Sequence, residues 1–132
     1  KELGISVNID ANSSLRRFPK KIDQHDIVVL LGNLIENAFA SFESVSREEK
    51  RIDISIEQSE DVLAILIEDN GCGMEEAYLP RIYEKGFTMN KEDGTGYGLY
   101  LVKQIVDKGM GQIDAASHPG QGTSFSILIP ME

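Results

Sequence analysis

The side chains in this sequence that could do chemistry begin with two asparagines in the stretch GNLIENAFA. Asn33 and Asn37 are four residues apart, so in a helix their amides lie on one face, one turn from each other. Asparagine is a poor helix former, so a pair at this spacing needs a reason. An amide oxygen can ligate a hard cation such as Mg2+, which prefers oxygen ligands. The alternative is that both amides bond the neighbouring backbone, and the helix by itself favours that alternative.

A second group of interest is DNGCGM, which follows an apolar run. A carboxylate at this place, Asp69, can accept a hydrogen bond from the exocyclic amine of adenine. Gly71 and Gly73 would let the backbone approach a purine, because neither carries a Cβ. The competing interpretation is a simple turn, since Asp-Asn-Gly is a common turn sequence.

A third group is GTGYGL, with glycines at positions 94, 96 and 98. Backbone N–H groups in such a loop bind phosphate where they open a helix. Two familiar motifs are excluded. A dinucleotide-binding loop needs glycine where Leu99 stands and a strand directly before it. A P-loop needs Gly-Lys-Ser/Thr, and the chain contains no such triplet.

Strands and helices must position these groups. Alternating or continuous apolar runs predict five strands, at 5–10, 51–58, 62–69, 111–117 and 122–130. The run at 62–69 is apolar on both faces, which predicts a central strand. Helical spacing predicts one helix that starts at an N-cap, Asp23, and a second from Gly98 to Lys108. This order predicts an α+β fold, a two-layer α/β sandwich with a mixed sheet.

Between Asp69 and Gly98 lies a long segment with no strong period, interrupted by Pro80 and Gly86. Loops of this length in a compact domain are usually functional or disordered. Glycine clusters at both ends favour a hinged lid over about 72–95, with nothing obvious that anchors it to the sheet. A tolerated surface insertion is the alternative.

Composition excludes several classes of protein. The 132 residues suit a single domain, 1–132, and the net charge of −9 without a basic stripe argues against nucleic acid as a partner. A single cysteine excludes an internal disulfide and suits a reducing compartment. We find neither a membrane-spanning apolar run nor a signal peptide. Because the chain starts at Lys1 without methionine, we expect a fragment of a longer protein.

Five stretches in order carry a resemblance to one family: NLIENAF, DNGCGM, IYEKGF, GTGYGL and GQGTSF. Together they resemble the ATP-binding catalytic domain of bacterial sensor histidine kinases, in the superfamily shared with gyrase, the Hsp90 chaperones and MutL. The resemblance covers Asp26 to Pro130 and implies the Bergerat fold, a mixed sheet covered on one face by helices, with a long ATP lid. Within the family, the chain is most similar to the branch that senses citrate and dicarboxylates.

The resemblance implies roles for matching positions. Asn37 is expected to ligate Mg2+, Asp69 to read the adenine amine, and Thr123 to lie beneath the adenine. Asn33 and Glu36 are the expected catalytic residues. Asn33 stands where ATPase relatives place a glutamate base, which favours transfer over hydrolysis, and Glu36 could orient a water. The other expected nucleotide contacts are Gly71, Gly73, Phe87, Thr88, Lys91, Gly94, Thr95, Gly96, Tyr97, Gly98 and Leu99. The lid base that meets the phosphates is left open between Lys91, Lys85 and Arg81.

The implied function is binding of MgATP, with ATP and Mg2+ as cofactors, and phosphoryl transfer to a histidine in two-component signalling. Neither His25 nor His118 lies in a matching motif, so the acceptor is expected on an upstream or separate helical dimerisation domain, with a response regulator as an indirect partner. The resemblance further implies a cytoplasmic domain of a membrane-bound sensor, monomeric when isolated. Two alternatives stay open: an anti-sigma-factor-type serine kinase, and a non-catalytic nucleotide-binding module.

Overall fold

A computed structural model of the chain describes residues 4–10, 15–43, 45, 49–87 and 97–132. The elements are β1 (Ile5–Ile9), α1 (Gln24–Ala40), β2 (Lys50–Gln58), β3 (Val62–Asp69), the 3-10 helix η1 (Glu76–Arg81), α2 (Gly98–Lys108), β4 (Gln112–His118) and β5 (Gly122–Pro130). The expected strands and helices are therefore all present, and the strand ends differ by a single residue where they differ.

The strands form one mixed sheet in the order β1-β2-β3-β5-β4. β1 pairs with β2 in parallel, and every other pair is antiparallel. β3 lies in the middle, as its apolar run predicts. Its two ladders are long, with Ile65 opposite Ile56 on one side and Ile127 on the other. The α+β class and the mixed sheet are confirmed.

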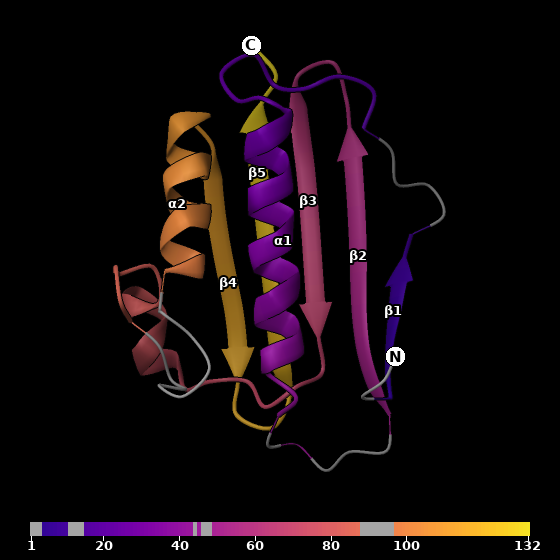
Figure 1. The fold of residues 1–132 in the computed structure, drawn as a ribbon, viewed down its shortest axis with the longest axis vertical. Helices are drawn as coiled ribbons and strands as arrows, with labels where there is room; N and C mark the ends of the chain where they lie inside the picture. Colours follow the sequence, from indigo (N-terminus) through magenta and orange to yellow (C-terminus); the bar gives the residue numbers. More distant parts are fainter. Residues whose placement is uncertain (1–3, 11–14, 44, 46–48, 88–96) are drawn as a thin grey trace.

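Both helices cover the same face of the sheet (Figure 1). Ile27, Leu30, Leu34 and Ala38 form the buried stripe of α1, and they pack with the inward side chains of the strands into one core. Asp23 is the N-cap of α1, as predicted. Its carboxylate accepts the Asp26 N–H at 2.9 Å, and the Asp26 carboxylate accepts the Asp23 N–H at 3.1 Å. This reciprocal capping fixes where the helix starts.

The topology brings three chain segments to one end of the molecule, the lower end in Figure 1: the end of α1, the end of β3 and the β4–β5 turn. The start of α2 lies farther up, beside the middle of α1, where a Cβ on Gly98 would be 3.2 Å from Asn33 Oδ1. These segments carry most of the predicted site residues that the structure describes.

The segment predicted to be an unanchored lid is anchored over its described part, residues 72–87. Ile82 is 3% exposed and belongs to the core, and Leu79, Tyr83 and Phe87 pack against that core. The Met74 N–H donates to Ser117 Oγ at 2.8 Å, which ties the start of the segment to β4. The expectation that nothing anchors this stretch is wrong, because apolar residues spaced irregularly around η1 still reach the core. The remainder of the predicted lid, 88–95, lies outside the described residues.

Candidate functional site

Asp69, the last residue of β3, is half-buried and surrounded by hydrogen-bond donors. Its Oδ1 accepts the Gly71 N–H at 2.9 Å and faces Ser41 Oγ at 3.2 Å. Burial raises the pKa of this carboxyl, while the bonds from Gly71, Ser41 and the Thr123 backbone act in the opposite direction. Hydrogen-bond donors around a carboxyl group favour its ionised form, which can only accept hydrogen bonds. The geometry therefore fits the predicted role of Asp69 as an acceptor for an amine.

The glycines around Asp69 have a different physical reason from the one predicted. A Cβ on Gly71 would lie 2.0 Å from Ser41 Oγ, and a Cβ on Gly73 would lie 2.0 Å from the His118 carbonyl oxygen. Gly73 also has a φ of +68°, a conformation that favours glycine. The missing side chains leave room for these protein atoms. A nucleotide contact by either backbone stays a prediction.

Asn70, between these residues, joins the exit of β3 to the start of β2. Its Oδ1 accepts the Arg51 N–H at 2.7 Å, its Nδ2 donates to the Glu49 carbonyl at 2.9 Å, and its backbone N–H donates to the Arg51 carbonyl at 3.2 Å. Sequence reasoning missed this role. Asn70 extends the β2–β3 ladder by one step and fixes the chain at the point where it leaves Asp69.

Thr123 lies in a buried hydroxyl pair at the same end. It is opposite Asp69 in the β3–β5 ladder, and its Oγ1 is 2.8 Å from Ser117 Oγ. Ser117 is 3% exposed and also lies 3.0 Å from the Gly122 carbonyl. The structure thus places Thr123 next to Asp69, and its predicted place beneath an adenine stays a prediction. Ser117, its hydroxyl partner, was not predicted from the sequence.

The two asparagines of α1 differ in their surroundings. Asn33 Nδ2 donates to the Val29 carbonyl at 2.8 Å, so this amide bonds the backbone of its own helix. Its Oδ1 faces α2, where a Cβ on Gly98 would lie 3.2 Å from it. Asn37 is half-buried, and its amide has no hydrogen-bond partner within the part of the chain that the structure describes. Glu36 is exposed, on the same face of α1 as the exposed Gly32 and Ala40.

The start of α2 faces the middle of α1, at Asn33. Gly98 is its first residue, Leu99 is half-buried and Tyr97 is exposed. The Lys85 ammonium lies 5.6 Å from the centre of the Tyr97 ring. Five predicted nucleotide contacts, Thr88, Lys91, Gly94, Thr95 and Gly96, lie outside the described residues, so the predicted phosphate loop is represented only by Gly98 and its neighbours.

Phe87 packs within its own segment. Its ring centre is 6.1 Å from that of Tyr78, and the Arg81 guanidinium lies 5.0 Å from it. Arg81 also forms an ion pair with Glu84 at 3.5 Å. The described contacts of Phe87 and Arg81 are structural, and their predicted roles toward a nucleotide stay predictions.

The Asn37 amide fits Mg2+ by its chemistry. It is a neutral oxygen donor on a half-buried helix flank, without a competing partner among the described residues. The described residues contain no group of three or more His, Cys, Asp or Glu side chains able to hold a metal ion. Within the described residues, a Mg2+ ion at Asn37 would have this amide oxygen as its ligand, and phosphate oxygens and water are the other ligands such an ion accepts.

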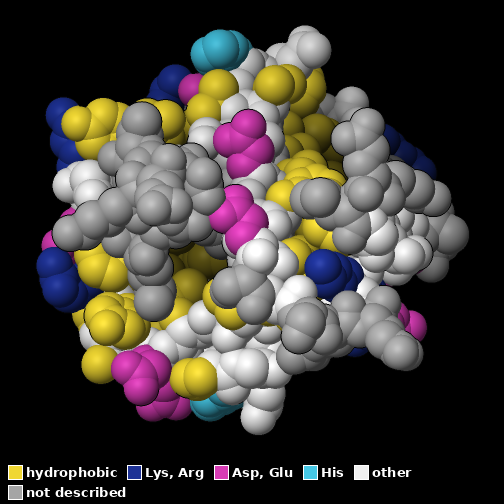
Figure 2. Space-filling view, turned by 60° about the horizontal axis from the view of Figure 1, so that its bottom comes forward, with side chains coloured by type: hydrophobic (Ala, Val, Ile, Leu, Met, Phe, Trp, Pro, Cys, Tyr) yellow, Lys and Arg dark blue, Asp and Glu magenta, His cyan; other side chains and the backbone are white. Residues whose placement is uncertain are grey.

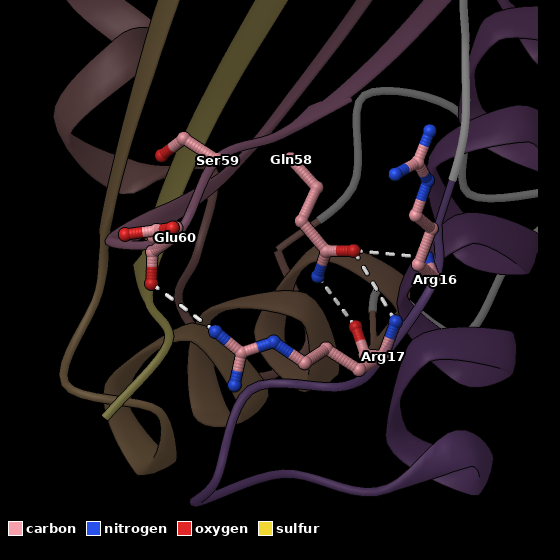
Figure 3. A pocket seen from close by; sticks show the side chains of 5 residues that line it. All are labelled: Arg16, Arg17, Gln58, Ser59 and Glu60. Atoms are coloured by element: carbon pink, nitrogen blue, oxygen red, sulfur yellow. Dashed lines mark hydrogen bonds between the residues drawn. The ribbon is translucent and has the colours of Figure 1, made fainter.

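Figure 2 looks toward this end of the molecule and shows a hollow with hydrophobic side chains beside a ridge that carries acidic groups. A separate shallow pocket lies at the opposite end, lined by Arg16, Arg17, Gln58, Ser59 and Glu60 (Figure 3). There the Gln58 amide bonds the backbone of both arginines, with Oε1 2.8 Å from the Arg16 N–H nitrogen. These residues form hydrogen bonds with one another, and none of them is a predicted site residue.

The chain matches known proteins over almost its whole length. Residues 22–132 match the family described as histidine kinase-, DNA gyrase B-, and HSP90-like ATPase. A probable C4-dicarboxylate sensor kinase of Bacillus subtilis (strain 168) is 72% identical over all 132 residues, which correspond to 25% of that protein. The sensor histidine kinase CitA of Klebsiella pneumoniae is 31% identical over 99% of this chain and 24% of its own length. The chain thus spans about a quarter of these relatives.

Solved structures share the fold. The mycobacterial sensor histidine kinase MprB superposes with a TM-score of 0.79 at 20% identity, over 97% of this chain and 84% of that one. Full-length ShkA in complex with AMPPNP gives a TM-score of 0.77 at 23% identity, over 98% of this chain and 26% of that one. None of the helices in the described ranges is long and apolar enough to cross a membrane. The match over residues 22–132 identifies the chain as a member of the histidine kinase-, DNA gyrase B- and HSP90-like ATPase family.

Proposed function

We propose that this chain is the ATP-binding catalytic domain of a sensor histidine kinase, and that it binds MgATP and transfers the γ-phosphoryl group to a histidine on a helical domain elsewhere in the parent protein. The observation that carries the proposal is Asp69, a half-buried carboxylate held by Ser41 and Gly71 at the end of the sheet where α1 ends. The family match and the sensor-kinase relatives support it.

Each described group has a part in the proposed function. Asp69 accepts a hydrogen bond from the adenine amine, and Thr123 lies beside it beneath the purine. Asn37 holds the Mg2+ ion, which offsets phosphate charge and orients the transferred group. The N–H groups at the start of α2, from Gly98, face the phosphates, where the helix dipole favours negative charge.

Asn33 favours transfer over hydrolysis. Its amide is bonded to the Val29 carbonyl, and an amide is not a base. Glu36, the other predicted catalytic residue, lies three residues after Asn33 on α1 and is exposed, and its proposed part is to orient a water. We therefore propose that bound ATP turns over slowly until an acceptor histidine is supplied. The serine-kinase and non-catalytic alternatives have no specific observation in their favour.

The parent protein belongs to the same proposal. By analogy with relatives named as C4-dicarboxylate and citrate sensors, we propose a cytoplasmic domain of a membrane-bound sensor that responds to a small carboxylate and passes phosphate to a response regulator. The isolated chain is proposed to be monomeric.

Calorimetric titration with ATP tests the binding half of the proposal. Asp69→Asn should weaken ATP by more than about tenfold, since a hydrogen bond to a charged group is worth roughly 1.5–3 kcal/mol. Asn37→Ala should remove the difference in affinity between Mg2+ and EDTA buffers. Circular dichroism checks that both variants are folded. Unchanged ATP affinity in folded Asp69→Asn would remove Asp69 from the site.

A further inference from the structure

We propose that Ser41 is a positioning residue for purine recognition: its hydroxyl fixes one oxygen of Asp69, so that the other oxygen receives the exocyclic amine of the nucleotide. This inference rests on the proposed function of Asp69, and it assigns a role to a residue that the sequence analysis did not single out. Three observations around Ser41 carry it.

First, Ser41 is the junction between the helix that carries Asn37 and the chain that leaves Asp69. It is the C-cap of α1, and its carbonyl accepts the Cys72 N–H at 2.9 Å. Gly71 lies against this hydroxyl, and a Cβ at that position would be 2.0 Å from Ser41 Oγ. The hydroxyl is therefore enclosed between α1 and the β3 exit, and its position is set by backbone contacts on both sides.

Second, the single proton of this hydroxyl has two acceptors. Ser41 Oγ is 2.7 Å from the Ala38 carbonyl and 3.2 Å from Asp69 Oδ1. An ionised carboxylate forms the stronger hydrogen bond, about twice that of a neutral acceptor. The Ala38 carbonyl is not left without a partner when the proton turns to Asp69, because it also accepts the Ser41 N–H at 3.3 Å. Ionised Asp69 thus draws the hydroxyl proton toward itself.

Third, the donors from Ser41 and Gly71 converge on one oxygen. Both hydrogen bonds are to Oδ1. With Oδ1 engaged by two donors, the carboxylate is oriented, and Oδ2 is the oxygen that the proposal offers to a ligand. The groups that face this carboxyl are the Ser41 hydroxyl, the Gly71 and Thr123 N–H groups and the Cys72 thiol, whose own pKa is raised by burial and by Asp69.

The test compares two nucleotides that differ only in the amine. ATP carries the 6-amino group, and purine riboside triphosphate has hydrogen in its place. Ser41→Ala should weaken ATP about fivefold, the effect of one ordinary hydrogen bond, and leave the analogue within about twofold. Ser41→Thr, which keeps the hydroxyl, should retain the preference for ATP. Ser126→Ala, an exposed serine of β5, is the matched control and should change neither affinity.

A purely structural role would weaken both nucleotides equally in Ser41→Ala, and that result would overturn the proposal. If Asp69→Asn leaves the preference for ATP intact, the proposed adenine site itself has failed. If Asp69→Asn abolishes the preference and Ser41→Ala does not reduce it, only the role of Ser41 has failed.

A measurement without nucleotide covers the case in which the variants bind too weakly to compare. Carboxyl-carbon NMR titration of Asp69 in the free protein should give a higher pKa in Ser41→Ala than in the wild type, because a donor to the ionised form is lost. An unchanged pKa would show that Ser41 does not bond Asp69 in solution and would overturn the proposal.

Discussion

The substitution Gly73→Ala separates packing from ligand binding as the reason for glycine in DNGCGM. Gly73 has a φ of +68°, and an added Cβ would lie 2.0 Å from the His118 carbonyl oxygen and 2.8 Å from its carbon. Gly120 is the matched control, since its φ is +78° but a Cβ there meets nothing within 4 Å. The two variants share the backbone cost of a left-handed alanine, about 1 kcal/mol.

Only Gly73→Ala adds a collision with backbone. Overpacking of this kind costs about 1–3 kcal/mol. Displacing the segment also weakens the Gly120 N–H bond to the Cys72 carbonyl, 2.7 Å, and the Met74 N–H bond to Ser117, 2.8 Å. Each such bond is worth about 1 kcal/mol. We expect Gly120→Ala to lose about 1 kcal/mol of unfolding free energy and Gly73→Ala about 3–5 kcal/mol.

Urea denaturation without nucleotide measures both values, with thermal unfolding as a check at about 4 °C per kcal/mol for a domain of this size. Equal destabilisation of the two variants would refute the packing explanation. The predicted approach of a purine to this backbone would then be the better reason for Gly73.

Three further predictions concern stability. Gly32→Ala, on the exposed face of α1 with nothing within 4 Å of the new Cβ, should stabilise the domain by about 1 kcal/mol in the same urea assay, and a loss of stability would contradict the exposed setting. Tyr83→Phe should be neutral or raise Tm, because the buried Tyr83 hydroxyl has no partner within the described residues and its pKa is raised to about 12 by burial and by Asp114; a marked fall in Tm would reveal a partner. Asp26→Asn removes the ion pair that joins α1 to α2, Asp26 Oδ2 to Lys108 Nζ at 2.8 Å, and this bond lowers the pKa of Asp26 in the folded state. The ion pair's contribution to the free energy of unfolding is present above the unfolded pKa of Asp26 and is lost as pH falls through its lower folded pKa. The wild type should therefore be more stable than the variant at pH 7, and the two should become equally stable below about pH 4. A stability difference that does not change with pH would contradict the ion pair.

Local pattern was enough to predict the elements, because each has a signal in consecutive residues. The alternation of Ile52, Ile54 and Ile56 predicts a half-buried strand, and Asp23 followed by Asp26 predicts the start of α1. The order of strands was not predictable, because β1 pairs in parallel with β2, a strand that α1 separates from it in the sequence.

Within the site, Asn37, Asp69 and Thr123 lie toward one end of the fold, but the residues that hold these segments together were missed. Ser41, Asn70 and Ser117 act on segments distant in sequence: Ser41 reaches Asp69, Asn70 reaches Glu49, and Ser117 reaches Met74. A single sequence carries no periodic signal for such bonds. Gly71 and Gly73 were singled out because the lack of a Cβ would let a purine approach, whereas in the structure the atoms that lie against them are those of Ser41 and His118.

The most direct test of the central claim is phosphoryl transfer from radiolabelled ATP. The chain is mixed with the helical domain of its parent protein in Mg2+ buffer, and both the labelled protein and the released phosphate are measured. The proposal predicts a label on the helical domain that acid removes and alkali does not, slow phosphate release by the chain by itself, and no transfer by Asp69→Asn. Rapid phosphate release without an acceptor, or an acid-stable label on serine, would contradict it.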